Sequence, residues 1–445
     1  MRFNFSAFSN PCRPTMPESL SKLPTSAGEQ RDKSGLASII GPGLLTGASD
    51  DDPSGIGTYA QVGAHFGFGM LWTMLFSYPL MVSVQLISAR IGRVTGRGLA
   101  GNLRRHYPRT LLFPLVGLLL IANTINIGAD LGAMGAAMQL LVGGHAGWYT
   151  ALFGLLSAGL QVFVPYSRYV GWLKWLTLSL LAYVATVFII EVPWPEVLRS
   201  TIRPQLQFSS DYLTSIVAVF GTTISPYLFF WQASQEVEEL RAAPDEQPLK
   251  HAPHQAAGHL GRIELDTCLG MGVSNLVAYF IILTAAVTLY AHGVRDIESA
   301  SQAAEALKPI AGDFAFAVFA GGIVGTGLLA VPVLSGSAAY ALGEALAWRV
   351  GLEKKPGRAR GFYAVIAIAT LAGTAINFLH INPMKALFWT AVINGVIAVP
   401  ILATMMLLAA KRSAMGEFVV SGKLQALGWL TTAVMAACAV AMVVL

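Results

Sequence analysis

The stretch GPGLLTGASDDDPSGIG, residues 41–57, decides the fold of this chain. It places three consecutive carboxylates, Asp50, Asp51 and Asp52, directly before a proline. The sequence on both sides is otherwise apolar, from residue 36 to residue 68. Charged side chains are rare inside long apolar runs, so the position of these acids has to be explained by the fold and by what they bind.

Two arrangements would accommodate these acids. In the first, they lie in an outer loop and residues 36–49 alone form the first membrane span, which is shorter than the roughly 20 residues that a membrane helix needs. In the second, which we favour, the helix is interrupted at Pro53 and the carboxylates lie within the membrane. A buried carboxylate is costly without a partner, and no Lys or Arg lies in the middle of an apolar span. A cation is therefore the expected counter-charge.

The composition is that of a membrane protein. Of 445 residues, 54% are hydrophobic and 12% are charged, about half of the charged fraction of soluble domains, and the mean hydropathy is +0.59. The net charge of +5 does not indicate a nucleic-acid partner, because the basic residues fall between apolar segments. The three cysteines are scattered without CxxC or histidine spacing, so they support neither a zinc site nor a disulfide framework.

Two regions follow from this pattern. Residues 1–34 are polar, rich in Ser and Pro, and lack an apolar signal-peptide core, which predicts a disordered cytoplasmic tail. Residues 35–445 are predicted to form one transmembrane transporter domain of eleven helices. The predicted spans are 36–64, 68–91, 111–141, 148–166, 169–190, 212–239, 264–290, 313–343, 361–379, 385–409 and 424–445.

The distribution of basic residues orients these spans. With the N-terminus in the cytoplasm, all but five of the 29 Lys and Arg residues fall in cytoplasmic segments, as the positive-inside rule requires. The C-terminus is then outside. We expect a bacterial inner (plasma) membrane protein that is functional as a monomer in the lipid bilayer. The exceptions are Arg199, Arg203, Arg295, Lys308 and Lys385.

An odd number of spans in each half of a chain inverts the second half relative to the first. Spans 1–5 and 6–10 can form such a pair, with the eleventh helix appended. Both halves then open with an interrupted helix, the first at Pro53 and the second at Pro226 in FGTTISPYLFF, residues 220–230. Prolines also kink ordinary membrane helices, but here each lies among polar residues at the start of its half. The pattern predicts an all-α polytopic membrane protein of the inverted-repeat transporter class, with discontinuous helices 1 and 6.

The two interruptions predict a cation site. Where a helix breaks, the carbonyls at the end of its first segment lose their partners and carry partial negative charge. In the sixth span these carbonyls lie near Thr222 and Thr223. Carboxylate, carbonyl and hydroxyl oxygens are hard ligands that suit Mg²⁺, Mn²⁺ and Ca²⁺. The ion is expected to be the transported substrate, and no cofactor is expected.

The same residues resemble the signature motifs of the NRAMP divalent-metal transporters. GPGLLTGASDDDPSG is similar to the family's first-helix motif, and Asp52 matches the metal-binding Asp of DPGN while Gly55 matches its Asn. FGTTISPYLFF occupies the place of the sixth-helix GATVMPHN, so that Thr222 matches the Ala whose carbonyl binds metal, Ser225 the Met and Tyr227 the His. The resemblance implies a LeuT-type inverted-repeat fold with Asp52, Gly55, Thr222 and Ser225 at the metal.

Two of these matches change the ligand chemistry. Ser225 stands in place of a Met thioether, a soft ligand that favours transition metals, and Gly55 stands in place of an amide oxygen. The larger cavity would suit Mg²⁺, which keeps several waters when bound, and Asp50 and Asp51 would hold those waters. The pattern is similar to the NRAMP-related magnesium transporters, which implies import of Mg²⁺, and also of Mn²⁺, by alternating access. The alternative is a proton-coupled Mn²⁺ or Fe²⁺ importer of the ordinary NRAMP type.

The resemblance leaves proton coupling open. The family's proton route uses the sixth-helix His and acidic residues of the third helix. The His position is Tyr227 here, and tyrosine does not titrate near neutral pH. In the third span Asp130 matches the Asp of the route, whereas the expected Glu falls at Ala133. We expect uptake that is driven by the membrane potential without protons, although Asp130 would be able to support coupling.

Further polar and aromatic residues have two interpretations. Asn123, Asn126 and Asp130 share one face of the third span and form either a polar vestibule or interhelical hydrogen bonds. Trp231 either lines the pathway or packs against a neighbouring helix. The residues expected around the metal ligands or in the vestibule are Asp50, Asp51, Thr223, Tyr227, Asn126, Asp130 and Trp231.

Two charged segments are also ambiguous. The glutamates of residues 236–239 either attract cations near the inner exit or form a solvated helix end. The three histidines of residues 251–259 would form a regulatory metal site or, as we favour, lie in a flexible linker.

Two other function classes are weighed. An intramembrane protease or phosphatase would need a second positioned acid or a phosphate-binding loop, and the sequence has neither, so no enzyme is expected. An amino-acid transporter of the same fold would hold the substrate carboxylate at helix N-termini. Three aspartates at the interruption would repel that carboxylate.

Overall fold

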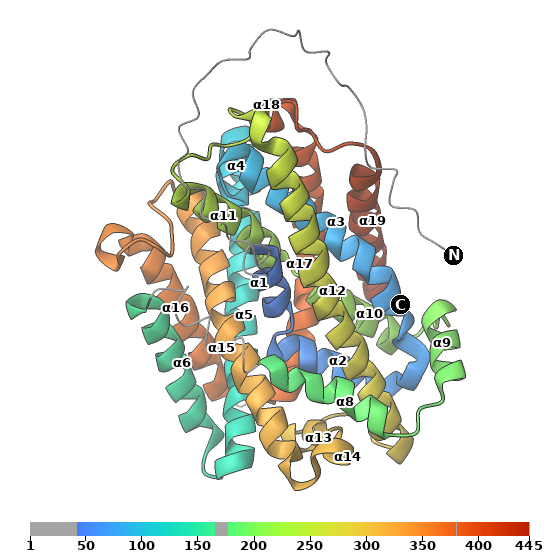
Figure 1. Cartoon of the computed structure of the whole chain (residues 1–445). Helices are drawn as coiled ribbons and strands as arrows, with labels where there is room; N and C mark the ends of the chain where they lie inside the picture. The colour runs from blue at the N-terminus through green and yellow to red at the C-terminus, as the bar shows by residue number, and fades with distance from the viewer. Residues whose placement is uncertain (1–41, 165–176, 380, 445) are drawn as a thin grey trace, which may run out of the picture. The chain divides into compact units, whose positions relative to one another are not determined.

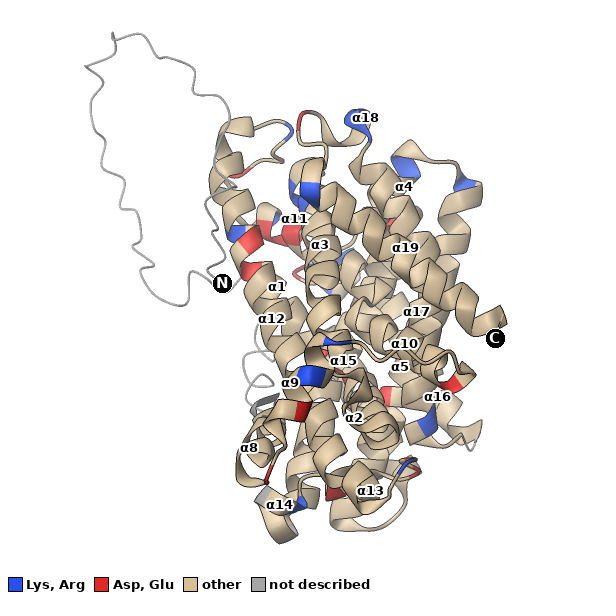
Figure 2. Ribbon diagram, turned by 90° about the vertical axis from the view of Figure 1, so that its right-hand side faces the viewer, with Lys and Arg blue, Asp and Glu red and all other residues tan. Residues whose placement is uncertain are grey.

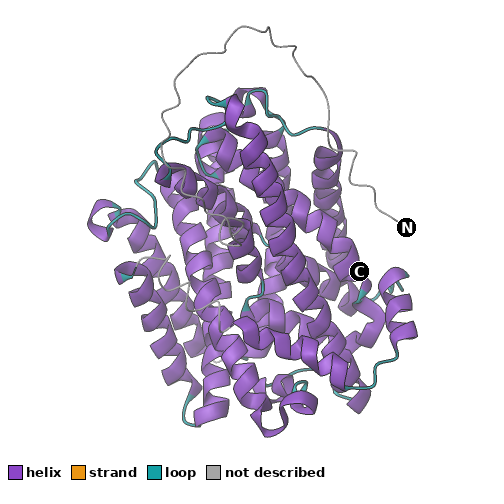
Figure 3. Ribbon diagram, in the orientation of Figure 1, coloured by secondary structure: helices purple, strands orange, loops and turns teal. Residues whose placement is uncertain are grey.

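The computed structural model describes residues 42–164, 177–379 and 381–444. Within these ranges every regular element is a helix (Figure 3), as the composition predicts. The predicted tail of residues 1–34 lies outside the described residues, and so does the start of the predicted fifth span.

Long apolar helices make up most of the bundle (Figure 1), and short helices connect them. The long ones are α3 (Trp72–Thr95), α5 (Arg109–Val142), α6 (Ala146–Phe163), α12 (Ala256–Thr288), α15 (Ala315–Ala345), α16 (Arg360–Ile376), α17 (Pro383–Ala409) and α19 (Gly422–Val444). The short ones are α4 (Leu99–His106), α8 (Leu181–Ile189), α9 (Trp194–Ile202), α13 (Ala300–Glu305), α14 (Lys308–Ala311) and α18 (Arg412–Met415).

Both predicted discontinuous helices are present. The first consists of α1 (Pro42–Asp50) and α2 (Pro53–Phe66), and the second of α10 (Ser210–Thr223) and α11 (Pro226–Ala242). In each case the second segment begins with a proline, which has no N–H to leave unpaired and whose fixed φ suits the first helical position. Pro53 and Pro226 therefore restart the helices after each break.

Nine spans in the described part of the chain are long and apolar enough to cross a membrane, with α10 and α11 counted as one. They coincide with nine of the predicted ranges. The first predicted span is divided between α1 and α2, each of which is too short to cross alone. Of the fifth, the described residues include α8 and the turn before it.

Close packing against α12 fixes the position of α1 near the middle of the bundle (Figure 1). A methyl group added at Gly47 would overlap the Gly270 carbonyl, so the two backbones touch, as small residues allow between membrane helices. Asp266 of α12 also accepts hydrogen bonds from the N–H groups of Gly43, at 2.6 Å, and Leu44, at 3.1 Å. These bonds satisfy N–H groups that the first turn of α1 would leave unpaired.

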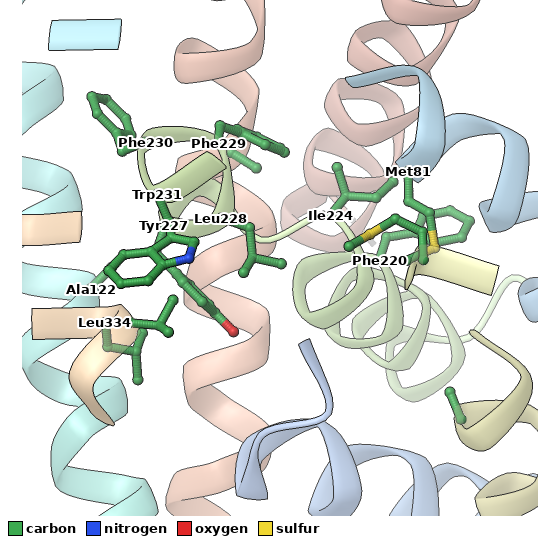
Figure 4. Packing of buried hydrophobic residues seen from close by; sticks show 14 of the residues in the cluster. Met81, Ala122, Phe220, Ile224, Tyr227, Leu228, Phe229, Phe230, Trp231 and Leu334 are labelled. Carbon is green, nitrogen blue, oxygen red and sulfur yellow. The ribbon is translucent and has the colours of Figure 1, made fainter. Parts of the chain in front are cut away.

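Apolar side chains pack around the break between α10 and α11. Figure 4 shows Ile224 beside Phe220 and Met81 at the turn, and Trp231 beside Leu334 of α15. All five side chains are buried. This packing stabilises the turn at which α10 ends and α11 begins.

The outside of the bundle is apolar where a membrane would surround it. Phe163 of α6, Ile368 of α16 and Val443 of α19 are among many large apolar side chains that are more than half exposed. Such a surface is stable in lipid but not in water. Lys and Arg instead gather toward the end of the bundle near α4, α11 and α18 (Figure 2).

Candidate metal site

Asp52 lies at the break between α1 and α2 and is 2% exposed. It caps the N-terminus of α2, because its Oδ1 accepts hydrogen bonds from the Gly55 N–H and the Ser54 hydroxyl, both at 2.7 Å. A short polar residue is preferred at this position, and the helix dipole favours its negative charge. The local sequence therefore holds the carboxylate at a fixed place in the membrane-spanning bundle.

The second oxygen of Asp52 faces two other helices. Its Oδ2 accepts hydrogen bonds from Asn126 Nδ2 of α5, at 3.2 Å, and from the Tyr227 hydroxyl of α11, at 3.3 Å. The same hydroxyl lies 3.3 Å from the Ser49 carbonyl at the end of α1. A single carboxylate thus connects both interrupted helices with α5, through Asn126 and Tyr227, two of the residues expected around it.

A chain of amides leads from Asp52 to a second acid. Asn126 Nδ2 also donates to Asp130 Oδ2 at 3.1 Å, and Asn394 Nδ2 of α17 donates to Asn126 Oδ1 at 3.0 Å. Oδ1 of Asp130 has no hydrogen-bond partner among the described residues. Asn123 belongs to a different contact, because its amide donates to α15. The predicted polar face of the third span is therefore divided between the site and interhelical contact.

Asp50 and Asp51 are also buried, and they share one donor. The Ser274 hydroxyl of α12 lies 2.8 Å from Asp50 Oδ2 and 3.1 Å from Asp51 Oδ1. One hydroxyl has one hydrogen and can serve only one of these acids at a time. Asp50 Oδ1 has no hydrogen-bond partner in the described part of the chain.

Four carboxylates are therefore buried close to the first break: those of Asp50, Asp51, Asp52 and Asp130. No Lys or Arg of the described residues forms an ion pair with any of them. Buried charge without a partner is costly. The site is thus suited to hold a cation, or protons in its absence.

The second break is closed on itself. The Ser225 hydroxyl lies 2.8 Å from the carbonyls of both Gly221 and Thr222, at the end of α10. The Thr223 hydroxyl bonds to the Val219 carbonyl within the same helix, at 3.0 Å. The Thr222 carbonyl, which the sequence comparison assigns to the metal, therefore already has a donor in this conformation. Carbonyl and hydroxyl oxygens still have lone pairs when the hydroxyl donates to the carbonyl, so Ser225 and Thr222 remain predicted ligands.

Gly55 lies where the two breaks approach each other. A Cβ added there would lie 3.1 Å from Thr222 Oγ1 and 3.4 Å from both the Asp50 carbonyl and Asp52 Oδ1. The absent side chain thus leaves a position surrounded by oxygen atoms. The described residues contain no cluster of three or more His, Cys, Asp or Glu side chains in metal-binding geometry, so a metal here would depend on mixed oxygen ligands and water.

Trp231 is fully buried and packs edge to face against Tyr340 of α15, with 6.3 Å between ring centroids. Gly336 makes room for its ring, because a methyl group there would lie 2.8 Å from the indole. Of the two interpretations, the contacts of Trp231 match the packing of helices. The adjacent Gln232 accepts a hydrogen bond from Thr46 and so ties α11 to α1.

The two ambiguous charged segments have defined partners. Glu236 and Glu239 both pair with Arg262, at 3.2 and 2.7 Å. His259 lies on α12, where its ring nitrogens are within 2.9 Å of an Arg93 nitrogen. The glutamates are thus engaged in ion pairs, and His259 is part of a helix and not of a linker.

Two residues of the site were missed in the sequence. Ser274 and Asn394 are polar residues of the long apolar helices α12 and α17, which contain other polar residues such as Asn275 and Thr390. A polar group inside a membrane span is a candidate functional residue. Which of the many such residues face the acids depends on helix packing, which no local pattern specifies.

A cavity of about 540 Å³ opens beside α2, α10 and α17. Acidic residues in its wall include Asp211, Asp296 and Glu298, and Gln61 of α2 also lines it. Gln61 is about 14 Å along the helix from Asp52 at 1.5 Å per residue. The cavity lies toward the end of α2 that is away from Asp52, and its acidic residues would attract cations.

Comparison with known proteins agrees with this geometry. The model of natural resistance-associated macrophage protein-like proteins (Nramp) matches residues 43–445. The chain is 27% identical over 395 residues to the divalent metal cation transporter MntH of Acidiphilium cryptum, covering 86% of this chain and 85% of that protein. It is also 27% identical over 300 residues to MntH of Yersinia enterocolitica, covering 65% and 69%.

Solved structures share the fold. The Eremococcus coleocola manganese transporter superposes with a TM-score of 0.72 at 15% identity, over 96% of this chain and 90% of that one. Mhp1 in an inward-facing conformation has a TM-score of 0.52 at 13% identity, over 91% and 90%. The chain is thus an all-helical, multi-pass membrane protein with a LeuT-like fold. It belongs to the natural resistance-associated macrophage protein-like family, as a transporter and not an enzyme.

Proposed function

We propose that this protein moves a divalent metal cation across the membrane by alternating access, with Asp52 as the metal-binding carboxylate. The observation that carries the proposal is the position of Asp52, buried at the break of one helix and hydrogen-bonded to the other interrupted helix through Tyr227. A cation bound there would replace donors from α5 and α11. Cation binding would therefore change the contacts of α5 and α11 with the first break, and such a change can be coupled to the movement of helices in alternating access.

We propose Mn²⁺ as the main substrate, with Fe²⁺ as a related one. The named relatives are divalent metal cation transporters, and the structural neighbour is a manganese transporter. The oxygen atoms around Gly55 agree with this substrate, because carboxylate, carbonyl and water ligands suit Mn²⁺. The direction of transport is proposed to be uptake.

The chain from Asp52 through Asn126 to Asp130 supports proton coupling. Asn126 donates to both Asp52 and Asp130, so the protonation of each carboxylate depends on the charge of the other. A divalent ion at Asp52 would withdraw that carboxylate from Asn126 and favour loss of a proton from Asp130, by repulsion between the cation and the proton. This arrangement favours the proton-coupled alternative over uptake driven by potential alone.

A second candidate is uptake of Mg²⁺ without protons. It is favoured by the donors to Asp52 among the described residues, which are Ser54, Gly55, Asn126 and Tyr227 and so include neither a sulfur atom nor a histidine. Tyr227 takes the histidine position. Soft ligands are what distinguish transition metals from Mg²⁺. None of the relatives reported above is named as a magnesium transporter, so the magnesium assignment stays a prediction from Gly55 and Ser225.

The architecture that we propose for transport is the one predicted from the sequence. Spans 1–5 and 6–10 form inverted repeats and the eleventh helix is appended, in a monomer whose N-terminal tail, residues 1–34, and basic end face the cytoplasm. The bacterial relatives favour the plasma membrane. The positive end near α4, α11 and α18 supports this orientation (Figure 2).

The test is metal uptake by proteoliposomes that contain the purified protein and an internal pH dye. Mn²⁺ uptake that is accompanied by internal acidification, and that Mg²⁺ at the same concentration does not inhibit, is the expected result. Uptake of Mg²⁺ without acidification would instead support the second candidate. If vesicles with the protein take up neither Mn²⁺ nor Mg²⁺ faster than empty vesicles do, both candidate functions are contradicted.

A further inference from the structure

A second charged cavity lies at the basic end of the bundle, far in sequence from the acids of the metal site. It has a volume of about 420 Å³ and is bounded by α4, the end of α11 and the end of α15. Four arginines line it: Arg97, Arg104, Arg105 and Arg241. Trp348 lies in the same wall.

Most of the arginines that line this cavity have no acidic ion-pair partner among the described residues. Arg97, Arg104 and Arg105 form no ion pair among the described residues. Arg241 pairs with Glu238 at 3.3 Å. Three exposed arginines therefore line one cavity and form no ion pair in the described part of the chain.

The acidic residue in the wall, Glu344, is engaged by backbone. Its two oxygens accept hydrogen bonds from the N–H groups of Gly98, at 3.1 Å, and Gly101, at 2.8 Å, at the start of α4. Glu344 thus joins α15 to α4 and holds the segment that carries the arginines. It does not form an ion pair with them in the described structure.

The positive field extends to the other side of α4. Burial and the neighbouring cations Lys411, Arg105, Lys250 and Arg97 lower the pKa of His106 below its usual value. A smaller cavity of about 200 Å³ there shares Arg97 and Arg105 with the larger one. Both sides of this short helix therefore favour an anion.

The wall of the larger cavity is fixed in an unusual backbone conformation. Ala347, which follows α15, has φ of 61°, and it is the only non-glycine residue with positive φ among the described ones. The turn is closed by a hydrogen bond of 2.7 Å from the Trp348 N–H to the Gly343 carbonyl. It directs Trp348 against Gly361 of α16. Such a strained residue persists where the surrounding structure holds it, often at ligand sites.

We propose that this cavity binds a phosphate-bearing anion, with the headgroup of an anionic phospholipid as the favoured source. Guanidinium groups match phosphate oxygens with paired hydrogen bonds, and basic pockets between membrane helices on the cytoplasmic side bind lipid headgroups. Trp348 and Leu346 are 43% and 40% exposed beside it, as expected at the membrane edge. Soluble phosphate has the same chemistry and is the other source.

The anion would connect helices that belong to different parts of the transporter. Arg241 is in the last turn of α11, the second segment of an interrupted helix, whereas Arg104 and Arg105 are on α4. An anion between them would hold α11 against α4 and α15. The site goes beyond the proposed function and does not depend on which cation is carried.

The test is binding to the purified full chain in detergent, followed by thermal unfolding and by native mass spectrometry. The probes are dihexanoyl phosphatidylglycerol, dihexanoyl phosphatidylcholine and inorganic phosphate. The variant R104Q/R105Q removes two lining charges, and R358Q/R412Q removes two exposed charges outside the cavity, so the two variants have equal net charge. Arg97→Gln is a second lining variant in case the double variant does not fold.

We expect phosphatidylglycerol to bind the wild type and R358Q/R412Q, and to bind R104Q/R105Q about tenfold more weakly, because charge-assisted hydrogen bonds are lost. Inorganic phosphate that binds as tightly as the lipid, with the same loss in R104Q/R105Q, would support the site and assign it to soluble phosphate. Equal binding of phosphatidylcholine, an equal loss in both double variants, or no binding of any probe would overturn the proposal.

Discussion

The two helix breaks have the same backbone design but opposite chemistry. At the first, the buried Asp52 accepts hydrogen bonds from three helices, and no Lys or Arg of the described residues forms an ion pair with it. At the second, the Ser225 hydroxyl bonds to carbonyls at the end of the preceding helix, α10. The difference teaches that an interrupted helix is not by itself a ligand site. The first break provides the negative charge of the candidate site. The second break provides a turn and the Tyr227 hydroxyl, which donates a hydrogen bond to Asp52.

Removing the charge from the first break should have the largest effect. Asp52→Ala should reduce Mn²⁺ uptake by about 100-fold or more, because loss of one partner of a buried charge pair costs several kcal/mol. Ser225→Ala, at the second break, should change uptake by no more than about threefold. Both are measured in proteoliposomes with equal amounts of folded protein, checked by gel filtration. Similar losses in the two variants would mean that the breaks contribute equally.

The next effect concerns the acid linked to Asp52 through Asn126. Asp130→Asn keeps the shape and the hydrogen bond but removes the titratable group. We expect metal-dependent acidification to fall by about tenfold while Mn²⁺ binding persists, because the proton step is separate from the metal ligand. A pH dye and a metal dye are read in the same vesicles. Unchanged acidification in this variant would show that protons do not use Asp130.

A smaller effect is expected from adding a soft ligand to the second break. Ser225→Met removes the hydroxyl that bonds to the Thr222 carbonyl and introduces a thioether. Uptake should shift toward Cd²⁺ over Mg²⁺ by about tenfold, since thioethers prefer soft metals. Competition of Cd²⁺ and Mg²⁺ against Mn²⁺ uptake gives the ratio, and Ser225→Ala controls for loss of the hydroxyl. If the ratio stays the same in Ser225→Met, this side chain does not reach the ion.

The smallest effect should come from Asn123, whose amide bonds to α15 and not to Asp52. Asn123 donates to the Leu334 carbonyl and the Ser337 hydroxyl of α15, each at 2.8 Å. Asn123→Ala should lower the free energy of unfolding by about 1 kcal/mol, a typical value for interhelical hydrogen bonds. Thermal unfolding in detergent measures the change. A large loss of uptake at unchanged stability would instead assign Asn123 to the pathway.

The sequence was sufficient for the backbone of the site. Pro53 and Pro226 each lie among polar residues at the start of one half of the chain, so both breaks could be predicted, whereas Pro79, Pro114, Pro332 and Pro400 lie inside continuous helices. Burial of Asp52 followed from the length that a membrane span needs. The order of apolar segments predicted nine spans that the structure contains. These features depend on local rules and on the thickness of the membrane.

The partners of the site could not be predicted in the same way. Whether Asn126 or Asn123 faces Asp52 depends on how α5 is rotated against α15, and Ser274 meets Asp50 and Asp51 only because glycines bring α1 onto α12. The Ser225 hydroxyl bonds to the carbonyls of Gly221 and Thr222 in α10. Such a local bond depends on side-chain geometry, which residue type alone does not determine.

The central claim is that the charge at the first break binds the cation and that the second break does not need its hydroxyl to do so. Isothermal titration of Mn²⁺ into purified wild type, Asp52→Asn and Ser225→Ala tests it most directly, because binding is measured without transport. The account predicts that Asp52→Asn binds at least about 100-fold more weakly and that Ser225→Ala stays within about threefold of wild type. Wild-type affinity in Asp52→Asn, or loss of binding in Ser225→Ala alone, would contradict it.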